Sequence, residues 1–332
     1  MKRAYITHVT ENYLEIARNL ALSVRNFSDI PLIVYVINPT SDHQFMFGGI
    51  DNIFIRNIDL DLDQSSDADY TFNSEGNFYV NRESTRIFKI ASAKIIAMQL
   101  SIEEGFEEIC YLDSDCIATP VVDEIFSWMP LIKDYPLTSE GIHQYMIIVE
   151  SNGRERGNPF EGCWPATDLT KTLEWPLMNF LQMNQEARGT YRTTNVALFN
   201  SSCLEFIRIW KDFCYLLPKL NLKLIDIVPF QEETLYNVLS WKKTNEGLPL
   251  CYINLRDGMQ TVKHFYEEGM PGFSTWMDEQ NKDYSMNFYL IPHDKRNVKV
   301  LHGEKRRDEF EKILQYLVEL NQAGYFKKSE EK

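Results

Sequence analysis

The chain has 332 residues, of which 44% are hydrophobic and 25% are charged. This composition is typical of globular proteins and excludes collagen-like and disordered classes, while the length excludes small disulfide scaffolds. The 34 Lys and Arg residues against 48 Asp and Glu residues give a formal net charge of −14, which opposes nonspecific binding to nucleic acid or anionic lipid. A nucleotide diphosphate would therefore need a local positive centre, such as a bound cation.

The first residues lack the apolar stretch and cleavage site of a signal peptide, and no run of about 18 apolar residues occurs, so we expect no membrane-spanning helix. The six cysteines form no CxxC pair, and we interpret them as reduced, mostly buried thiols. These observations predict a cytoplasmic protein and leave peripheral attachment to a membrane open.

The first elements predict a parallel sheet. Residues 4–9 are β-rich, and residues 13–24 carry apolar side chains at helical spacing, with Thr10 as a candidate N-cap. Residues 32–37 form a continuous apolar run of strand length. A strand, a helix and a buried strand in this order favour a parallel sheet that is covered on both faces. The polar residues 51–81 predict a loop-rich excursion.

The middle of the chain alternates between regular and irregular segments. Residues 83–100 predict a helix with several basic side chains, and the short apolar strand 108–112 runs directly into Asp113-Ser114-Asp115. Residues 133–192 have weak periodicity and several Gly, Pro and Trp residues, which predicts an irregular insertion on the acceptor side rather than sheet.

The last third is predicted to alternate strands and helices. The predicted strands cover residues 194–200, 250–253 and 297–301, and the predicted helices cover 204–216, 232–241 and a segment that ends at 320. We expect one catalytic domain over residues 1–326, followed by a charged tail at 327–332.

The pattern Asp-x-Asp occurs several times, and its context distinguishes the copies. Asp59/Asp61, Asp61/Asp63 and Asp67/Asp69 lie in the polar segment, where a solvated acidic loop is the simpler interpretation. Asp113 and Asp115 instead follow an apolar strand, and open α/β sheets bind ligands outside the carboxyl ends of their strands. Two such carboxylates can face one hard cation that also binds substrate phosphates. The alternative is a turn Asp that caps the next segment.

A second strand end carries His302, with Lys305 three residues later. Imidazole together with carboxylates suits Mn²⁺ or a similar ion, and Lys305 could act as a point charge on a phosphate. A capping or surface histidine is the alternative for His302.

The segment 109–118, ICYLDSDCIA, with VDEIF at 122–126, resembles the DxD segment of GT-A glycosyltransferases, especially the family 8 type of glycogenin and galactosyltransferases. Further similarities lie in Thr7 with Asn12-Tyr13-Leu14, in the basic helix, and in three later segments. These segments are Asn195-Val196-Ala197-Leu198-Phe199-Asn200, Gln231-Glu232-Glu233 with Asn237, and His302-Gly303-Glu304-Lys305. The chain departs from the family pattern where a Gly is missing from the Asn195 strand and where Phe230 replaces an Asp.

The resemblance implies an α/β GT-A fold, a Rossmann-like mixed and mainly parallel sheet flanked by helices. It also implies that Asp113 and Asp115 bind Mn²⁺ or Mg²⁺ and the ribose and diphosphate side of the nucleotide, with Ser114 between them. His302 would complete the metal shell, and Lys305 would lie by the diphosphate.

Four further positions acquire expected roles through the same resemblance. Thr7 and Tyr13 would lie by the nucleotide base. Arg86 or Lys89 of the basic helix would lie near the phosphates, with a surface charge or a salt bridge on the helix face as the alternative.

The implied reaction moves a hexose from a nucleotide-diphosphate sugar, expected to be a UDP-sugar, to a saccharide or another hydroxyl acceptor, which could be lipid-linked or part of a protein. The leaving phosphate needs electrostatic stabilisation, and retention of configuration is inherited from the family. Glu232 and Glu233 are candidates for a base or for a group that stabilises the cationic sugar. Their alternative role is that of acidic residues interacting with a helix dipole. Asn195 could contact donor-sugar hydroxyls or form a strand-end hydrogen bond.

The irregular segment supplies candidate acceptor contacts. Trp164 and Trp175 could stack against a sugar, although most tryptophans are core residues, and Asp168 and Arg154 could add polar contacts.

Two other functions stay open. A sugar nucleotidyltransferase usually has a Gly-rich loop after its first strand, whereas this chain has no glycine before Gly48. A GT-A-like protein that binds nucleotide or glycan without turnover is the non-enzymatic alternative.

Overall fold

The computed structural model describes residues 2–62, 70–72, 78–80, 85–130, 147–148, 194–220, 231–245, 259–261, 299–302 and 307–326. Their main feature is a six-stranded sheet with the strand order β3-β2-β1-β6-β9-β8. In chain order its strands are β1 (Arg3–Thr10), β2 (Leu32–Ile37), β3 (Ile53–Ile58), β6 (Glu108–Leu112), β8 (Ile147–Ile148) and β9 (Val196–Phe199). The neighbouring strands β3, β2, β1 and β6 pair in parallel. The strand β9 is antiparallel to both of its neighbours, β6 and β8.

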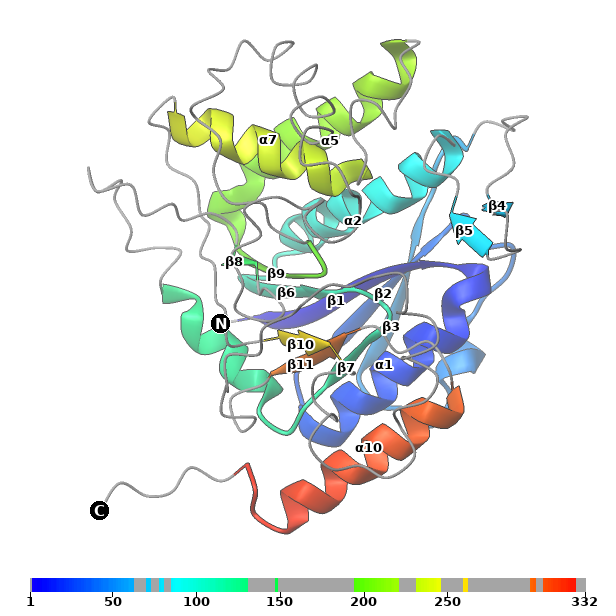
Figure 1. Cartoon of the computed structure of the whole chain (residues 1–332), viewed down its shortest axis with the longest axis vertical. Coiled ribbons are helices and arrows are strands. Elements are labelled where there is room, and N and C mark those ends of the chain that lie inside the picture. The colour runs from blue at the N-terminus through cyan, green and yellow to red at the C-terminus, as the bar shows by residue number, and fades with distance from the viewer. Residues whose placement is uncertain are drawn as a thin grey trace.

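Helices cover both faces of this sheet (Figure 1). On one face lie α2 (Thr85–Glu103), α5 (Leu204–Leu216) and α7 (Gln231–Asn245); on the other lie α1 (Leu14–Phe27) and α10 (Arg307–Gln322). The predicted mixed α/β class, with a mainly parallel central sheet flanked by helices, is confirmed.

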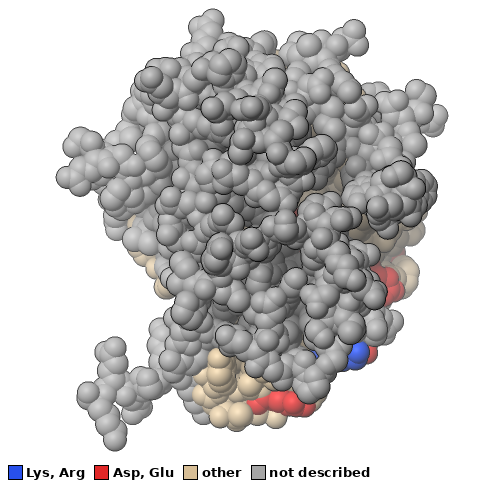
Figure 2. Space-filling model, in the orientation of Figure 1, with Lys and Arg blue, Asp and Glu red and all other residues tan. Residues whose placement is uncertain are grey.

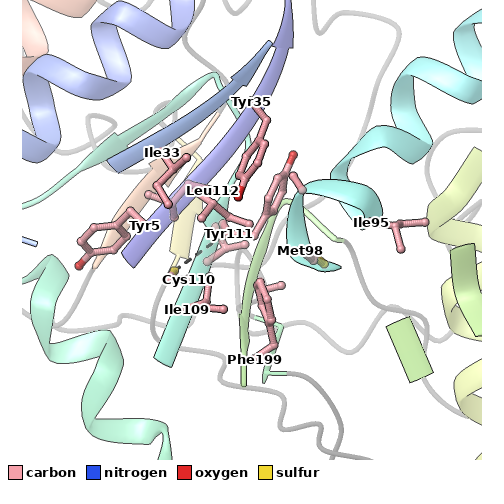
Figure 3. Packing of buried hydrophobic residues seen from close by; sticks show 14 of the residues in the cluster. Tyr5, Ile33, Tyr35, Ile95, Met98, Ile109, Cys110, Tyr111, Leu112 and Phe199 are labelled. Atoms are coloured by element: carbon pink, nitrogen blue, oxygen red, sulfur yellow. Dashed lines mark hydrogen bonds between the residues drawn. The ribbon is translucent and has the colours of Figure 1, made fainter. Parts of the chain in front are cut away.

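The central strands are buried because their sequences are apolar on both faces. Every residue of β2 and β6 is buried, as expected for strands between two helical layers. Figure 3 shows Tyr5 and Tyr111 on opposite sides of the sheet, with Tyr111 beside Met98 of α2. Because the residues within these strands are buried, the residues that follow the strands are the ones available at the carboxyl edge of the sheet.

Two predictions of irregular structure are corrected. The polar segment 51–81 contains β3 and a short hairpin of β4 (Tyr70–Phe72) with β5 (Phe78–Val80). The strand β3 escaped prediction because it pairs with β2 alone, so that most of its side chains are not buried. The segment 133–192 contributes β8, which pairs with β9 as an edge strand of the main sheet.

A second, three-stranded sheet has the order β10-β11-β7. It contains β7 (Cys116–Ala118), which follows the Asp113 turn, with β10 (Met259–Thr261) and β11 (Val300–His302). The strand β11 pairs antiparallel with β7, and His302 lies opposite Cys116. This sheet therefore brings the end of the chain back to the residues that follow Asp115.

The other predicted helices and strands overlap observed ones, and the predicted strand 250–253 lies outside the described residues. The predicted N-cap Thr10 is wrong, because it precedes the 3-10 helix η1 (Glu11–Tyr13) without a side-chain capping bond, and α1 starts only at Leu14. Four of the cysteines, at positions 110, 116, 203 and 214, are free and buried, as predicted. Within the described residues, no helix has the length and hydropathy needed to cross a membrane. Figure 2 shows acidic side chains at the lower edge of the view, where Figure 1 places α10.

Candidate functional site

The candidate site lies where the strand order changes direction. From β1 the chain steps through β2 to β3, and then returns to place β6 on the other side of β1. Ligands of open α/β sheets bind at such a switch point, outside the carboxyl ends of the strands. The carboxyl end of β6 also meets the start of β9, since Leu112 pairs with Val196. The residues that follow β6 and precede β9 thus face this crevice.

Asp113 and Asp115 share one tight turn after β6. The backbone amide of Asp113 donates to the carbonyl oxygen of Asn195 at 2.8 Å, and its carbonyl oxygen accepts from the amide of Cys116 at 3.0 Å. Asp115 is buried, whereas Asp113 and Ser114 are half-buried. The turn therefore presents two carboxylates one residue apart at the switch point.

Lys94 of α2 is the cation beside this turn. Its side chain is 6% exposed, and its Nζ lies 2.8 Å from Oε1 of Glu232 and 3.5 Å from Oδ1 of Asp113. It also donates to Oγ1 of Thr194 at 3.2 Å. Burial disfavours the charged ammonium, but the two carboxylates outweigh this effect and raise the pKa of Lys94 above its usual value. The lysine stays charged and joins three segments that are distant in sequence.

The first turn of α7 carries two acidic residues, Glu232 and Glu233. Glu233 accepts the backbone N–H of Thr194 through Oε2 at 3.1 Å. The indole N–H of Trp210 donates to the carbonyl oxygen of Glu232 at 2.9 Å, which anchors the first turn of the helix to α5. Gln231 has a φ of 54°, a left-handed conformation that costs free energy outside glycine. Its buried Nε2 has no hydrogen-bond partner among the described residues.

His8 and Tyr111 form a hydrogen-bonded chain that ends on Asp113. The Tyr111 hydroxyl donates to Oδ1 of Asp113 at 2.6 Å and lies 2.9 Å from Nδ1 of His8. The other ring nitrogen, Nε2, lies 3.2 Å from the carbonyl oxygen of Ile90. Burial, with the charge of Lys94, lowers the pKa of His8 to about 3. His8 is therefore uncharged near neutral pH.

These side chains surround one cavity of about 310 Å³. It is lined by His8, Ala91, Lys94, Asp113, Asn195, Gln231, Glu232 and Glu233. The structure thus brings together four of the predicted residues, namely Asp113, Asn195, Glu232 and Glu233.

The predicted metal ligands come from two segments that the small sheet holds side by side. Asp113 and Asp115 lie in the turn before β7, and the backbone of His302 pairs with that of Cys116. No group of three His, Cys, Asp or Glu residues that could hold a metal is found within the described part of the chain, which leaves out the His302 side chain. The two carboxylates have the oxygen chemistry that Mn²⁺ and Mg²⁺ require.

Other predicted site residues lie away from the cavity or outside the described residues. Thr7 is fully buried, so its side chain offers no surface to a nucleotide base. Tyr13 is partly buried and packs against the core. Neither Arg86 nor Lys89 lines the cavity, and the Lys89 amine donates to the carbonyl oxygen of Asp61 at 2.7 Å. The predicted contacts of Lys305, Arg154, Trp164, Asp168 and Trp175 lie outside the described residues.

Besides Ala91, three polar residues that line the cavity escaped prediction as site residues, namely Lys94, His8 and Gln231. Lys94 was visible as one of several basic residues on its helix, but it differs from Arg86 and Lys89 in lying amid apolar positions. A lysine on the buried face of a helix needs a partner, and that is the pattern that could have identified it. The signal for His8 was weaker: it is a polar residue within the predicted strand 4–9, which is a less specific sign of a site residue.

Neither a family model nor a curated protein matches the sequence significantly. Among solved structures, the chain is similar to the galactosyltransferase LgtC in complex with donor and acceptor sugar analogues, at 16% identity and a TM-score of 0.49. That match covers 96% of this chain and 95% of the other. Mouse xyloside xylosyltransferase 1, in its apo form, is similar at 13% identity and a TM-score of 0.49, over 92% of this chain and 98% of the other. Likenesses at these values assign no activity to this chain.

Proposed function

We propose that this protein is a metal-dependent glycosyltransferase that moves a hexose from a nucleotide-diphosphate sugar, with UDP as the expected nucleotide. The observation that carries the proposal is the cavity at the switch point, where Asp113 lines the same space as Glu232 and Glu233. Sugar transfer needs positive charge for the leaving diphosphate and negative charge near the cationic sugar, and this space adjoins groups for both.

Asp113, Asp115 and His302 would hold Mn²⁺ or Mg²⁺, which when bound supplies positive charge for the diphosphate. The register of β11 against β7 supports this set, because it brings the backbone of His302 to the residue that follows Asp115. Lys305, three residues after His302, is proposed to contact the diphosphate, and Ser114 lies in the same turn as the carboxylates. With the bound metal and Lys305 supplying positive charge, a protein with a net negative charge could bind the anionic donor.

Glu233 is the better candidate for the carboxylate that acts on the sugar. Glu232 is 7% exposed and ion-paired with Lys94, so its charge serves to hold that lysine. Glu233 is half-buried and lines the cavity. In the transfer, the bond between the anomeric carbon and the diphosphate oxygen breaks, and the diphosphate leaves with the electron pair. The acceptor hydroxyl bonds to the anomeric carbon, and its proton passes to Glu233, or to the departing diphosphate if Glu233 instead stabilises the developing cation.

The remaining parts of the proposal concern the acceptor and the stereochemistry. Asn195 lines the cavity, and we propose that it contacts donor-sugar hydroxyls. We assign the acceptor, a saccharide or another hydroxyl compound, to the side formed by residues 133–192. Retention of configuration follows from the resemblance of the DxD segment to family 8, and the anomer of the isolated product tests it.

The proposed function is tested by incubating the protein with a panel of nucleotide sugars, with and without Mn²⁺. Thermal shift reports binding, and nucleotide release reports transfer or hydrolysis. We expect at least one UDP-sugar to stabilise the protein only when Mn²⁺ is present, and to release UDP. If no nucleotide sugar binds in a metal-dependent way, the proposal is wrong. Binding without any turnover would favour the non-enzymatic alternative.

A further inference from the structure

We propose that Tyr111 is a positioning residue, whose hydroxyl orients the Asp113 carboxylate toward the metal ion. This inference rests on the proposed function, because it specifies how the chain prepares one carboxylate of the proposed metal site. It depends on where β6 places the phenol, on the contacts of the hydroxyl and on the burial of the ring.

The spacing at the end of β6 brings Tyr111 and Asp113 together. Side chains two residues apart in an extended chain point to the same face of a sheet. Tyr111 belongs to β6, and Asp113 follows the strand directly. The hydroxyl of Tyr111 donates to Oδ1 of Asp113 at 2.6 Å, a length typical of strong hydrogen bonds to a charged oxygen. The contact is therefore built into the local sequence of the turn.

The phenol of Tyr111 is held in one orientation between α2 and β1. Its ring is fully buried beside Met98 of α2, and a buried hydroxyl costs free energy unless it forms hydrogen bonds (Figure 3). Nδ1 of His8 on β1 lies 2.9 Å from the hydroxyl oxygen. Nζ of Lys94 on α2 lies 5.3 Å from the centre of the ring. Packing of the ring could be supplied by phenylalanine, whereas the polar contacts require the hydroxyl.

A fixed hydroxyl restricts the rotation of the carboxylate that it contacts. The side chain of Asp113 is 22% exposed and has two rotatable bonds. A hydrogen bond on Oδ1 holds the plane of the carboxylate and so sets the direction of its second oxygen. Groups that orient a metal ligand in this way typically change metal affinity by roughly 10- to 100-fold when they are removed. We therefore expect the Tyr111 hydroxyl to strengthen Mn²⁺ binding through Asp113.

Tyr5 provides a matched control on the opposite side of the sheet (Figure 3). It is fully buried on β1, and its hydroxyl donates to Oδ1 of Asp123 at 2.8 Å. Tyr111→Phe and Tyr5→Phe therefore each remove one buried hydroxyl that donates to an aspartate. Of the two aspartates, Asp113 alone belongs to the proposed metal site, so a general loosening of the fold is separated from a loss of positioning.

The test measures Mn²⁺ binding itself, from the electron paramagnetic resonance signal of the free ion in titrations with and without UDP. We expect Tyr111→Phe to weaken Mn²⁺ binding by on the order of tenfold. Tyr5→Phe should leave the dissociation constant within about twofold of the wild type. Unchanged affinity in Tyr111→Phe, or an equal loss in both variants, would overturn the inference and leave the proposed function intact. If the wild type binds no Mn²⁺ in either titration, the proposed metal dependence fails and the inference fails with it.

A second variant keeps the test decisive if thermal unfolding shows that Tyr111→Phe does not fold. His8→Gln removes the ring that contacts the phenol and leaves Tyr111 and Asp113 in place. Because the phenol then loses one of the contacts that hold it, we expect Mn²⁺ affinity without UDP to fall by on the order of threefold. In that case, an affinity equal to that of the wild type would overturn the inference.

Discussion

Lys94 and Lys299 are two buried lysines with different surroundings. The side chain of Lys299 is 5% exposed, and its Nζ lies 2.6 Å from Oε2 of Glu124, whose side chain is 36% exposed. The side chain of Lys94 is equally buried, but its partner Glu232 is only 7% exposed, and Asp113 lies beside it as well. One lysine therefore pairs at the edge of solvent, and the other compensates acids inside a cavity.

The difference lies in whether water can reach the carboxylate that each lysine contacts. The pair of Lys299 joins the start of β11 to the 3-10 helix η3 (Val122–Trp128), and water can solvate its carboxylate if the pair is broken. Around Lys94, the described lining of the cavity includes the carboxylates of Asp113, Glu232 and Glu233. Ionisable groups with shifted pKa values, here Lys94 and His8, cluster at functional sites, and this is why we place the proposed function at this cavity.

Removal of each lysine tests this comparison most strongly. Lys94→Met leaves Glu232 buried without its cation, so we expect a loss of about 3–5 kcal/mol in the free energy of unfolding. Lys299→Met leaves a carboxylate that water can reach, and we expect a loss of about 1 kcal/mol. Urea denaturation of both variants measures the two losses. Equal losses would contradict the distinction between the two lysines.

The pH dependence of stability tests the uncharged state of His8 beside Lys94. Its folded pKa of about 3 lies below the ordinary value of 6.5, so between these values the unfolded chain binds a proton that the folded chain does not. Stability should therefore fall as the pH drops below 6.5, by up to about 1.4 kcal/mol per pH unit, and this contribution should be constant above 6.5.

The measurement is urea denaturation between pH 7.5 and pH 5, a range that lies above the ordinary pKa of Asp and Glu. We expect a loss of up to about 2 kcal/mol in the wild type and a smaller loss in His8→Gln. The same slope in both proteins would show that His8 is not held neutral by its surroundings.

Removal of a single hydroxyl tests the hydrogen-bonded chain to Asp113. Tyr111→Phe loses the hydroxyl that donates to Asp113 and contacts His8, so we expect a loss of about 1–2 kcal/mol in the free energy of unfolding. In the matched variant Tyr215→Phe, the lost hydroxyl is buried and has no partner among the described residues. That variant should change stability by less than about 0.5 kcal/mol. Similar losses in both would indicate that the contact with Asp113 contributes nothing.

The sequence predicted the elements whose pattern is local. The apolar runs of β2 and β6 are continuous because both faces of these strands are covered, and their bounds were predicted without error. The strand β3 was missed because it pairs on one side and alternates weakly, and β7 because three residues after a turn carry no periodicity. Both β3 and β7 are strands because they pair with segments that are distant in the sequence, and a local pattern does not show such pairing.

The same limit applies to the site. Asp113 was predicted because it follows a buried strand, and Glu232 because sugar transfer can use a carboxylate and its segment resembles the family pattern. That Glu232 holds Lys94 could not be predicted, since the contact depends on how α2 and α7 pack. The hydrogen bond from Lys89 to the carbonyl oxygen of Asp61 could not be predicted either, because a basic residue on an amphipathic helix can face either a ligand or a loop.

The central claim is that the Asp113 turn, and not the other acidic patterns, binds a metal together with a nucleotide diphosphate. The most direct measurement is a calorimetric titration of UDP into the protein with and without Mn²⁺, in the wild type, in Asp115→Asn and in Asp61→Asn. We predict Mn²⁺-dependent binding in the wild type and in Asp61→Asn, and its loss in Asp115→Asn with the fold intact by circular dichroism. Unchanged binding in Asp115→Asn, or its loss in Asp61→Asn alone, would contradict the account.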